Sequence, residues 1–225
     1  MNDNRENIID IESSESFINI EDTYNGGNQH WFDSAKDGFS LAVSAGCGTV
    51  AASNLIAYLA FANPERYSNL VSFTKGNISK EDYTKYMEII YKYVHPLAMP
   101  FTGGKKPLGI FSARALAKGI ERYAKDKGCH ITTDKLANHS FNESVDFIKN
   151  NLKNNTPVGL LIWFNSNEKP YETHWMTIIG LIESSESRNV KVKVSTWGKI
   201  ETLNLFSLYD SPNLLQNFSL VSIKK

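Results

Sequence analysis

The most constraining feature of the sequence is one apolar stretch that begins directly after Gly46. It covers residues 47–62 and reads Cys-Gly-Thr-Val-Ala-Ala-Ser-Asn-Leu-Ile-Ala-Tyr-Leu-Ala-Phe-Ala. An Ala-rich segment of this length predicts a helix, and its apolar residues lie on nearly all faces. Such a helix is buried rather than laid on a surface, and Asn63-Pro64 ends it. The rest of the chain must therefore surround a central helix.

The segments after this helix change from helical to strand-like patterns. Three further helices are predicted over residues of about 80–93, 108–127 and 140–152. Gly128 is placed to end the second of these helices, and Ser140 with Glu143 has capping-box spacing at the start of the third. Short apolar or alternating runs predict strands at 158–164, 174–181, 190–194, 200–205 and 218–223. Helices first and antiparallel strands later predict an α+β fold.

The length and the polarity of the two ends suggest how the chain is organised. A chain of 225 residues is long enough to bury a core as one domain. Residues 1–27 are polar and end in Asn25-Gly26-Gly27, which predicts a mobile or loosely docked arm. Residues 28–225 are then expected to form the domain, with a helical lobe over about 46–155 and a sheet lobe over about 156–225.

Composition argues against several classes of partner. Lys plus Arg and Asp plus Glu both number 24, and no basic cluster stands out, so nucleic acid is not an expected partner. No apolar run approaches the roughly 18 residues of a membrane-spanning helix, and the acidic start lacks the pattern of a signal peptide. These observations predict a cytoplasmic protein without a membrane partner. Two cysteines and scattered histidines do not have the spacing of zinc ligands, so no metal and no cofactor is expected.

Cys47 is the strongest candidate nucleophile. A thiol reacts as its thiolate, and a position in the first turn of a helix is expected to lower its pKa. Gly46 and Gly48 are expected to leave the backbone open to a substrate, so that the Cys47 N–H faces a developing oxyanion. The alternative is a small buried cysteine in a tight turn, which is the commoner situation for a free cysteine.

His174 is the candidate base. It opens an apolar strand after the loop at 165–173, which places its ring at the edge of a sheet. A histidine that only caps the end of a strand is the alternative. The following strand ends in Ser195-Thr196-Trp197-Gly198. Ser195 is expected to orient the imidazole and Trp197 to keep water from that hydrogen bond. Thr196 is the other candidate for orienting the ring, on the opposite face of the strand from Ser195. A β-turn with a core tryptophan is the plainer interpretation.

In this order, the motifs resemble the papain-like cysteine peptidase superfamily. Cys47-Gly48 before an Ala-rich helix is similar to its double-glycine leader peptidase-like branch. The resemblance implies a papain-like fold with Cys47 as nucleophile, His174 as base and Ser195 at the position of the orienting Asn or Asp. The family's oxyanion-hole glutamine, a few residues before the cysteine, is not found here, and Gln29 is the nearest glutamine upstream.

Two functions follow. The first is a cysteine hydrolase that cleaves or transfers an amide bond of a peptide or protein substrate through an acyl-enzyme. The second is a catalytically impaired binding module on the same fold, which the serine at 195 and the displaced glutamine favour. The segments 100–107 and 165–173 are the expected walls of the cleft, because long polar or Gly-rich loops carry binding sites.

Overall fold

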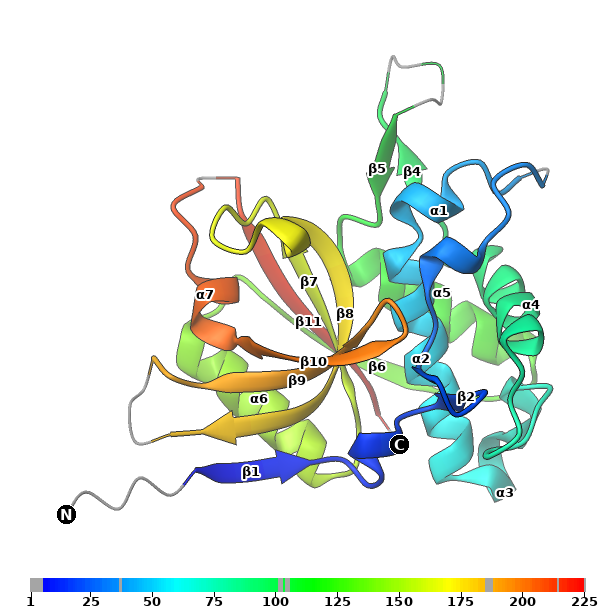
Figure 1. Cartoon of the computed structure of the whole chain (residues 1–225), viewed down its shortest axis with the longest axis horizontal. Coiled ribbons are helices and arrows are strands. Elements are labelled where there is room, and N and C mark those ends of the chain that lie inside the picture. Colours follow the sequence, from blue (N-terminus) through cyan, green and yellow to red (C-terminus); the bar gives the residue numbers. More distant parts are fainter. Residues whose placement is uncertain are drawn as a thin grey trace.

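A twisted antiparallel sheet and a group of helices beside it make up the structure (Figure 1). The computed structural model describes residues 6–36, 38–100, 103, 106–184, 188–213 and 215–224. The helices α1 to α5 gather on one side of the sheet, whereas α6 and α7 lie on the other (Figure 1). The predicted α+β class, with a mostly antiparallel sheet, is confirmed.

The main sheet has seven strands among the described residues, and its neighbours run in the order β10-β9-β8-β7-β11-β6. The first strand of the chain pairs with the far half of β8, and every one of these pairings is antiparallel. The strands are β1 (Asn7–Asp10), β6 (Thr132–Ala137), β7 (Val158–Trp163), β8 (Thr173–Glu183), β9 (Lys191–Thr196), β10 (Lys199–Asn204) and β11 (Asn217–Lys224).

The α-helices of the described residues are α1 (Ala42–Ala45), α2 (Cys47–Ala62), α3 (Pro64–Tyr67), α4 (Lys80–Tyr91), α5 (Ala113–Asp126), α6 (Phe141–Lys153) and α7 (Leu205–Tyr209). Single 3₁₀ turns lie at η1 (Ser14–Ser16), η2 (Gln29–Trp31), η3 (Ser68–Leu70) and η4 (Lys169–Tyr171). Two short hairpins pair β2 (Asn19–Ile20) with β3 (Tyr24–Asn25), and β4 (Leu97–Ala98) with β5 (Pro107–Gly109).

Helix α2 is the centre of the molecule, as its sequence predicts. Every residue from Cys47 to Ala60 is buried. The helix packs on the middle strands, where Leu55 comes so close to Gly159 that a Cβ on the glycine would lie 3.2 Å from Leu55 Cδ1. Burial on all faces explains why the apolar pattern has no polar stripe.

Two predicted helix caps are also confirmed. At the end of α5, Gly128 has φ +74°, its N–H bonds Lys125 O at 2.9 Å, and the N–H of Cys129 bonds Ala124 O at 2.8 Å. This is a Schellman motif, which needs a residue that tolerates positive φ. At the start of α6, Ser140 and Glu143 form the capping box. Helix α5 begins later than predicted because residues 107–109 form strand β5.

The prediction of an N-terminal arm is wrong for the part of it that the structure describes. Strand β1 extends the sheet, and Phe17, Ile18 and Ile20 are buried. Gly26 and Gly27 then pack against α2. This packing comes from isolated apolar residues in a polar stretch. The prediction missed them because it relied on the average polarity of the segment. Residues 1–5 lie outside the described residues, as do 101, 102, 104 and 105 of the predicted cleft wall.

The division into two lobes at about residue 155 is not observed. Strand β6 comes from within the predicted helical lobe but joins the edge of the sheet beside β11. Its sequence, Thr-Thr-Asp-Lys-Leu-Ala, is mostly polar and half exposed, as suits an edge strand. With β1 also taken from the N-terminal segment, the sheet draws on both ends and the middle of the chain.

Candidate active site

The backbone around Gly46 places Cys47 at the first residue of α2. The Gly46 N–H bonds Ala42 O at 2.8 Å, and Gly46 O accepts from the Val50 N–H at 3.0 Å. One helix thus ends and the next begins at this residue. A Cβ on Gly46 would lie 2.3 Å from Ala42 O, so the junction requires glycine.

Gly48 has a packing role rather than the predicted role of admitting a substrate. A Cβ at this position would lie 2.6 Å from Ile110 Cδ1 and 3.1 Å from Trp175 Cδ1. The indole N–H of Trp175 also bonds Ile110 O at 2.6 Å, which holds the two residues together over the first turn of the helix. Protein side chains therefore cover the backbone at Gly48.

The Cys47 thiol lies in a buried environment, with 9% of the residue exposed. Burial raises the pKa of the thiol, and this outweighs the lowering effect of the backbone N–H groups of Trp175, Gly48 and Cys47 itself. The prediction of a lowered pKa is therefore wrong. Desolvation disfavours the thiolate more strongly than the start of the helix stabilises it.

The His174 ring lies at the start of β8 and is also buried. Its Nε2 lies 2.7 Å from Thr196 Oγ1. The Trp197 ring covers it at a centroid distance of 4.4 Å, and the Tyr171 ring lies against both, at 5.4 Å from Trp197 and 6.1 Å from His174. Burial lowers the pKa of His174 to about 3, so the imidazole is neutral near pH 7. Trp197 thus shields the ring as predicted, from a turn where its φ is +47°.

The hydroxyl on the ring belongs to Thr196 and not to Ser195, the predicted partner. Ser195 pairs with Thr177 across the β8–β9 ladder, and Thr177 lies three residues after His174. Because side chains alternate along a strand, Ser195 and His174 are on opposite faces, and Thr196 shares the face of His174. Alternation was foreseen, but its phase relative to His174 depends on the register of the strands, which a sequence does not specify.

Ser195 lines the same cavity as Cys47 and His174, as does Asn54, but its hydrogen bonds go to other segments of the chain. Its Oγ donates to Asn25 O at 2.7 Å and accepts from Asn54 Nδ2 at 3.3 Å. Asn54 Oδ1 in turn accepts from the Gly27 N–H at 3.0 Å and from the Tyr83 hydroxyl at 2.7 Å. This network connects the N-terminal segment, α2, α4 and β9. Asn54 was missed at the sequence level, although an amide within an all-apolar helix is itself a sign of buried hydrogen bonds.

Gln29 reaches the site from η2, despite its distance from Cys47 in the sequence. The side chain is buried, and Nε2 donates to Val43 O at 2.9 Å. Its Oε1 is buried without a hydrogen-bond partner among the described residues. An unpaired buried carbonyl is unfavourable, which makes this amide a group that gains from a change of partner.

These residues meet around one small cavity. Gln29, Cys47, His174, Thr196 and Trp197 all line it, and its volume is about 10 Å³. This is at the lower limit of the roughly 10–15 Å³ that one water needs. Among the hydrogen bonds of the described residues, none joins Sγ of Cys47 to the His174 ring. The site is therefore closed in this conformation.

The chain matches no protein-family model and no curated protein sequence. Within the described residues, no helix is long and apolar enough to cross a membrane, and no three His, Cys, Asp or Glu side chains are grouped to hold a metal ion.

Proposed function

We propose that the chain is a cysteine hydrolase of papain-like architecture that acts on amide bonds, with Cys47 as nucleophile and His174 as base. The observation that supports this most is that a cysteine at the start of a buried helix and an oriented imidazole line the same cavity. The ring is held through Nε2 by Thr196, which leaves Nδ1 for exchange of a proton with the thiol.

In this proposal, Nδ1 of His174 takes the proton of Cys47 as Sγ attacks the carbonyl carbon of the amide. The C–S bond forms, the C–N bond breaks, and the imidazolium returns the proton to the leaving amine. Water then gives a proton to His174 and adds to the thioester. The C–S bond breaks, the carboxylic acid is released, and the imidazolium returns its proton to Sγ of Cys47. A second amine in place of water completes an acyl transfer with the same residues.

The neutral ground state is compatible with this chemistry. Burial of both groups favours the thiol and the imidazole over the ion pair. The proton then moves when the substrate arrives rather than before it. Gln29 supplies a donor for the oxyanion when its amide turns away from Val43, and one such donor is worth about 10²–10³ in rate.

A binding module on the same scaffold is the second proposal, and the closed cavity favours it. A volume of about 10 Å³ does not admit an amide group, so hydrolysis requires the residues around Cys47 to move apart. A protein that only binds a partner has no such requirement.

The deciding experiment measures hydrolysis of a panel of short peptide amides by the wild-type chain and by Cys47→Ala. Cys129→Ala is the matched control, because Cys129 is as buried as Cys47 but contacts Asn69 rather than lining the cavity with His174. We expect turnover and a thioester adduct, detected by intact mass, in the wild type and in Cys129→Ala but not in Cys47→Ala. Turnover that survives in Cys47→Ala would contradict the mechanism. A folded wild-type chain that turns over no amide would favour the binding module.

A further inference from the structure

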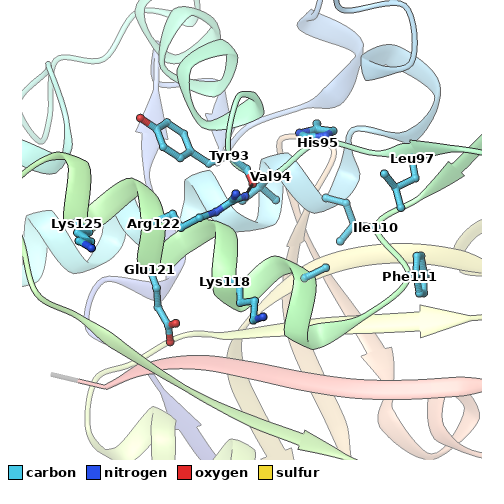
Figure 2. Close-up of a pocket in the computed structure, with 11 residues that line it drawn as sticks. Tyr93, Val94, His95, Leu97, Ile110, Phe111, Lys118, Glu121, Arg122 and Lys125 are labelled. Carbon is cyan, nitrogen blue, oxygen red and sulfur yellow. Dashed lines mark hydrogen bonds between the residues drawn. The ribbon is translucent and has the colours of Figure 1, made fainter.

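A groove much larger than the cavity at Cys47 lies beside α5. Its volume is about 560 Å³, and it is bounded by the segment at 93–97, residues 110–111 and one face of α5 (Figure 2). One end is apolar and is lined by Leu97, Ile110 and Phe111 (Figure 2). Leu97 and Phe111 are 47% and 44% exposed, which is unusual for side chains of this size and leaves apolar surface uncovered.

The apolar end of the groove adjoins the first turn of α2. Ile110 packs on Gly48 and its carbonyl accepts from the Trp175 indole, as described above. Val94 O accepts from the Thr49 hydroxyl at 2.6 Å. The residues directly after Cys47 are thus in contact with the wall of the groove. A ligand in the apolar end would be separated from the first turn of α2 by Ile110, and it would reach Cys47 once the residues around the closed cavity move apart, as hydrolysis itself requires.

The other end of the groove is cationic. Lys118, Arg122 and Lys125 follow one another along α5 at spacings of four and three residues, and Figure 2 shows them in this order away from Ile110 and Phe111. All three are exposed. Among the described residues, none of them forms an ion pair, and Arg122 uses one nitrogen to bond Tyr93 O at 2.9 Å.

One carboxylate also lines the groove, but it is already engaged. Glu121 Oε1 accepts from the N–H and the hydroxyl of Thr133, at 3.0 and 2.5 Å. The side chains that line the groove therefore include three Lys or Arg cations and one carboxylate, which is already hydrogen-bonded to Thr133. Lys118 and Lys125 are roughly 10 Å apart along the helix axis, which is about three residues of an extended peptide.

We propose that this groove binds the peptide substrate of the Cys47 site, with apolar residues next to the scissile bond and acidic residues farther along. The inference rests on the proposed function, since it assigns the groove to the same substrate. The order of the two ends favours a peptide over a fatty acyl chain. An acyl chain attached at Cys47 would place its tail among the lysines, whereas a peptide places carboxylates there.

The test uses two fluorescein-labelled pentapeptides, each with the apolar pair Leu-Phe, followed by three glutamates in one and by three lysines in the other. Binding is measured by fluorescence anisotropy with Cys47→Ala, so that hydrolysis plays no part. The charge variant carries Lys118→Glu and Lys125→Glu. Its matched control carries Arg114→Glu and Lys92→Glu, which are exposed cations of α5 and of the end of α4 outside the groove.

We expect the glutamate peptide to bind at least tenfold more tightly than the lysine peptide, with an affinity that falls as salt is added. The Lys118→Glu, Lys125→Glu variant should lose about tenfold or more of this affinity, while the Arg114→Glu, Lys92→Glu control stays within about twofold. Phe111→Asp, at an exposed position, should weaken both peptides.

Equal binding of the two peptides, or equal losses in the charge variant and its control, would overturn the inference. So would displacement of a bound fluorescent fatty acid by laurate but not by the glutamate peptide. The outcome is separable from that for the proposed function. If the peptides bind as expected but the wild-type chain turns none of them over, the groove is a peptide-binding site and the proposed hydrolase activity is wrong. If the wild-type chain turns over peptides regardless of their charge, the hydrolase activity stands and the assignment of the groove is wrong.

Discussion

The sites of the two cysteines are equally buried but differ in their neighbouring groups. Cys47 is 9% exposed and Cys129 is 8% exposed, and both are free thiols. Cys129 follows the end of α5, where its thiol lies 3.0 Å from Asn69 Oδ1. Cys47 begins α2, where backbone N–H groups approach its sulfur and His174 shares its cavity. Burial alone therefore does not distinguish a structural thiol from a candidate nucleophile, whereas the neighbouring groups do.

The largest difference between the two cysteine sites should come from the buried imidazole of His174, through its effect on the free energy of unfolding. The pKa of His174 is lowered from 6.5 to about 3, so the unfolded chain binds this proton more readily than the folded one. The folded state keeps its full stability, as far as His174 is concerned, above pH 6.5 and loses part of it as the pH falls toward 3. By linkage, the loss reaches about 5 kcal/mol.

This prediction is checked by urea unfolding between pH 7 and pH 3. His174→Gln should remove most of this acid destabilisation, whereas His130→Gln, at an exposed histidine, should retain it. Identical pH profiles of the wild type and His174→Gln would show that the ring is not buried as a neutral group.

The next effect concerns the hydroxyl that holds the ring. Thr196→Val keeps the shape of the side chain but removes the bond to Nε2, and turnover of an accepted amide should fall by roughly 10²-fold. Ser195→Ala should reduce turnover less than about tenfold, because Ser195 contacts Asn25 and Asn54 rather than the ring. Measured kcat/KM values for the two variants decide the matter, and a larger loss in Ser195→Ala would contradict this assignment.

A smaller difference should appear in the reactivity of Cys47 itself. Because burial raises the pKa of Cys47, little thiolate is present at pH 7, and reactivity should increase only at alkaline pH. Labelling of Cys129→Ser with iodoacetamide, followed by mass spectrometry, reports Cys47 alone. We expect at least roughly tenfold slower labelling than for a small free thiol at pH 7. Fast labelling that is constant below pH 7 would instead indicate a preformed ion pair.

The smallest effect is expected at Cys129. Cys129→Ala removes one thiol contact with Asn69, which should cost about 1 kcal/mol of unfolding free energy and leave turnover unchanged. Thermal unfolding and the amide assay measure both quantities on the same sample. A loss of turnover in this variant would remove the distinction between the two cysteines.

The sequence alone predicted the elements whose signals are local. The buried helix from Cys47, the caps at Gly128 and Ser140, and the five C-terminal strands were all identified from periodicity and from residue types that favour particular backbone conformations. Among the strands of the main sheet, β1 and β6 were missed, and their hydrogen bonds come from partners far along the chain.

At the candidate site, the sequence determined which side chains are present, and the tertiary structure decided what they contact. Strand register placed Thr196 rather than Ser195 on the His174 ring, and chain packing brought Gln29 to the cavity from η2. Burial reversed the expected shift of the Cys47 pKa. Register, packing and desolvation all depend on residues distant in sequence, whereas propensity and capping depend on neighbours a few positions away.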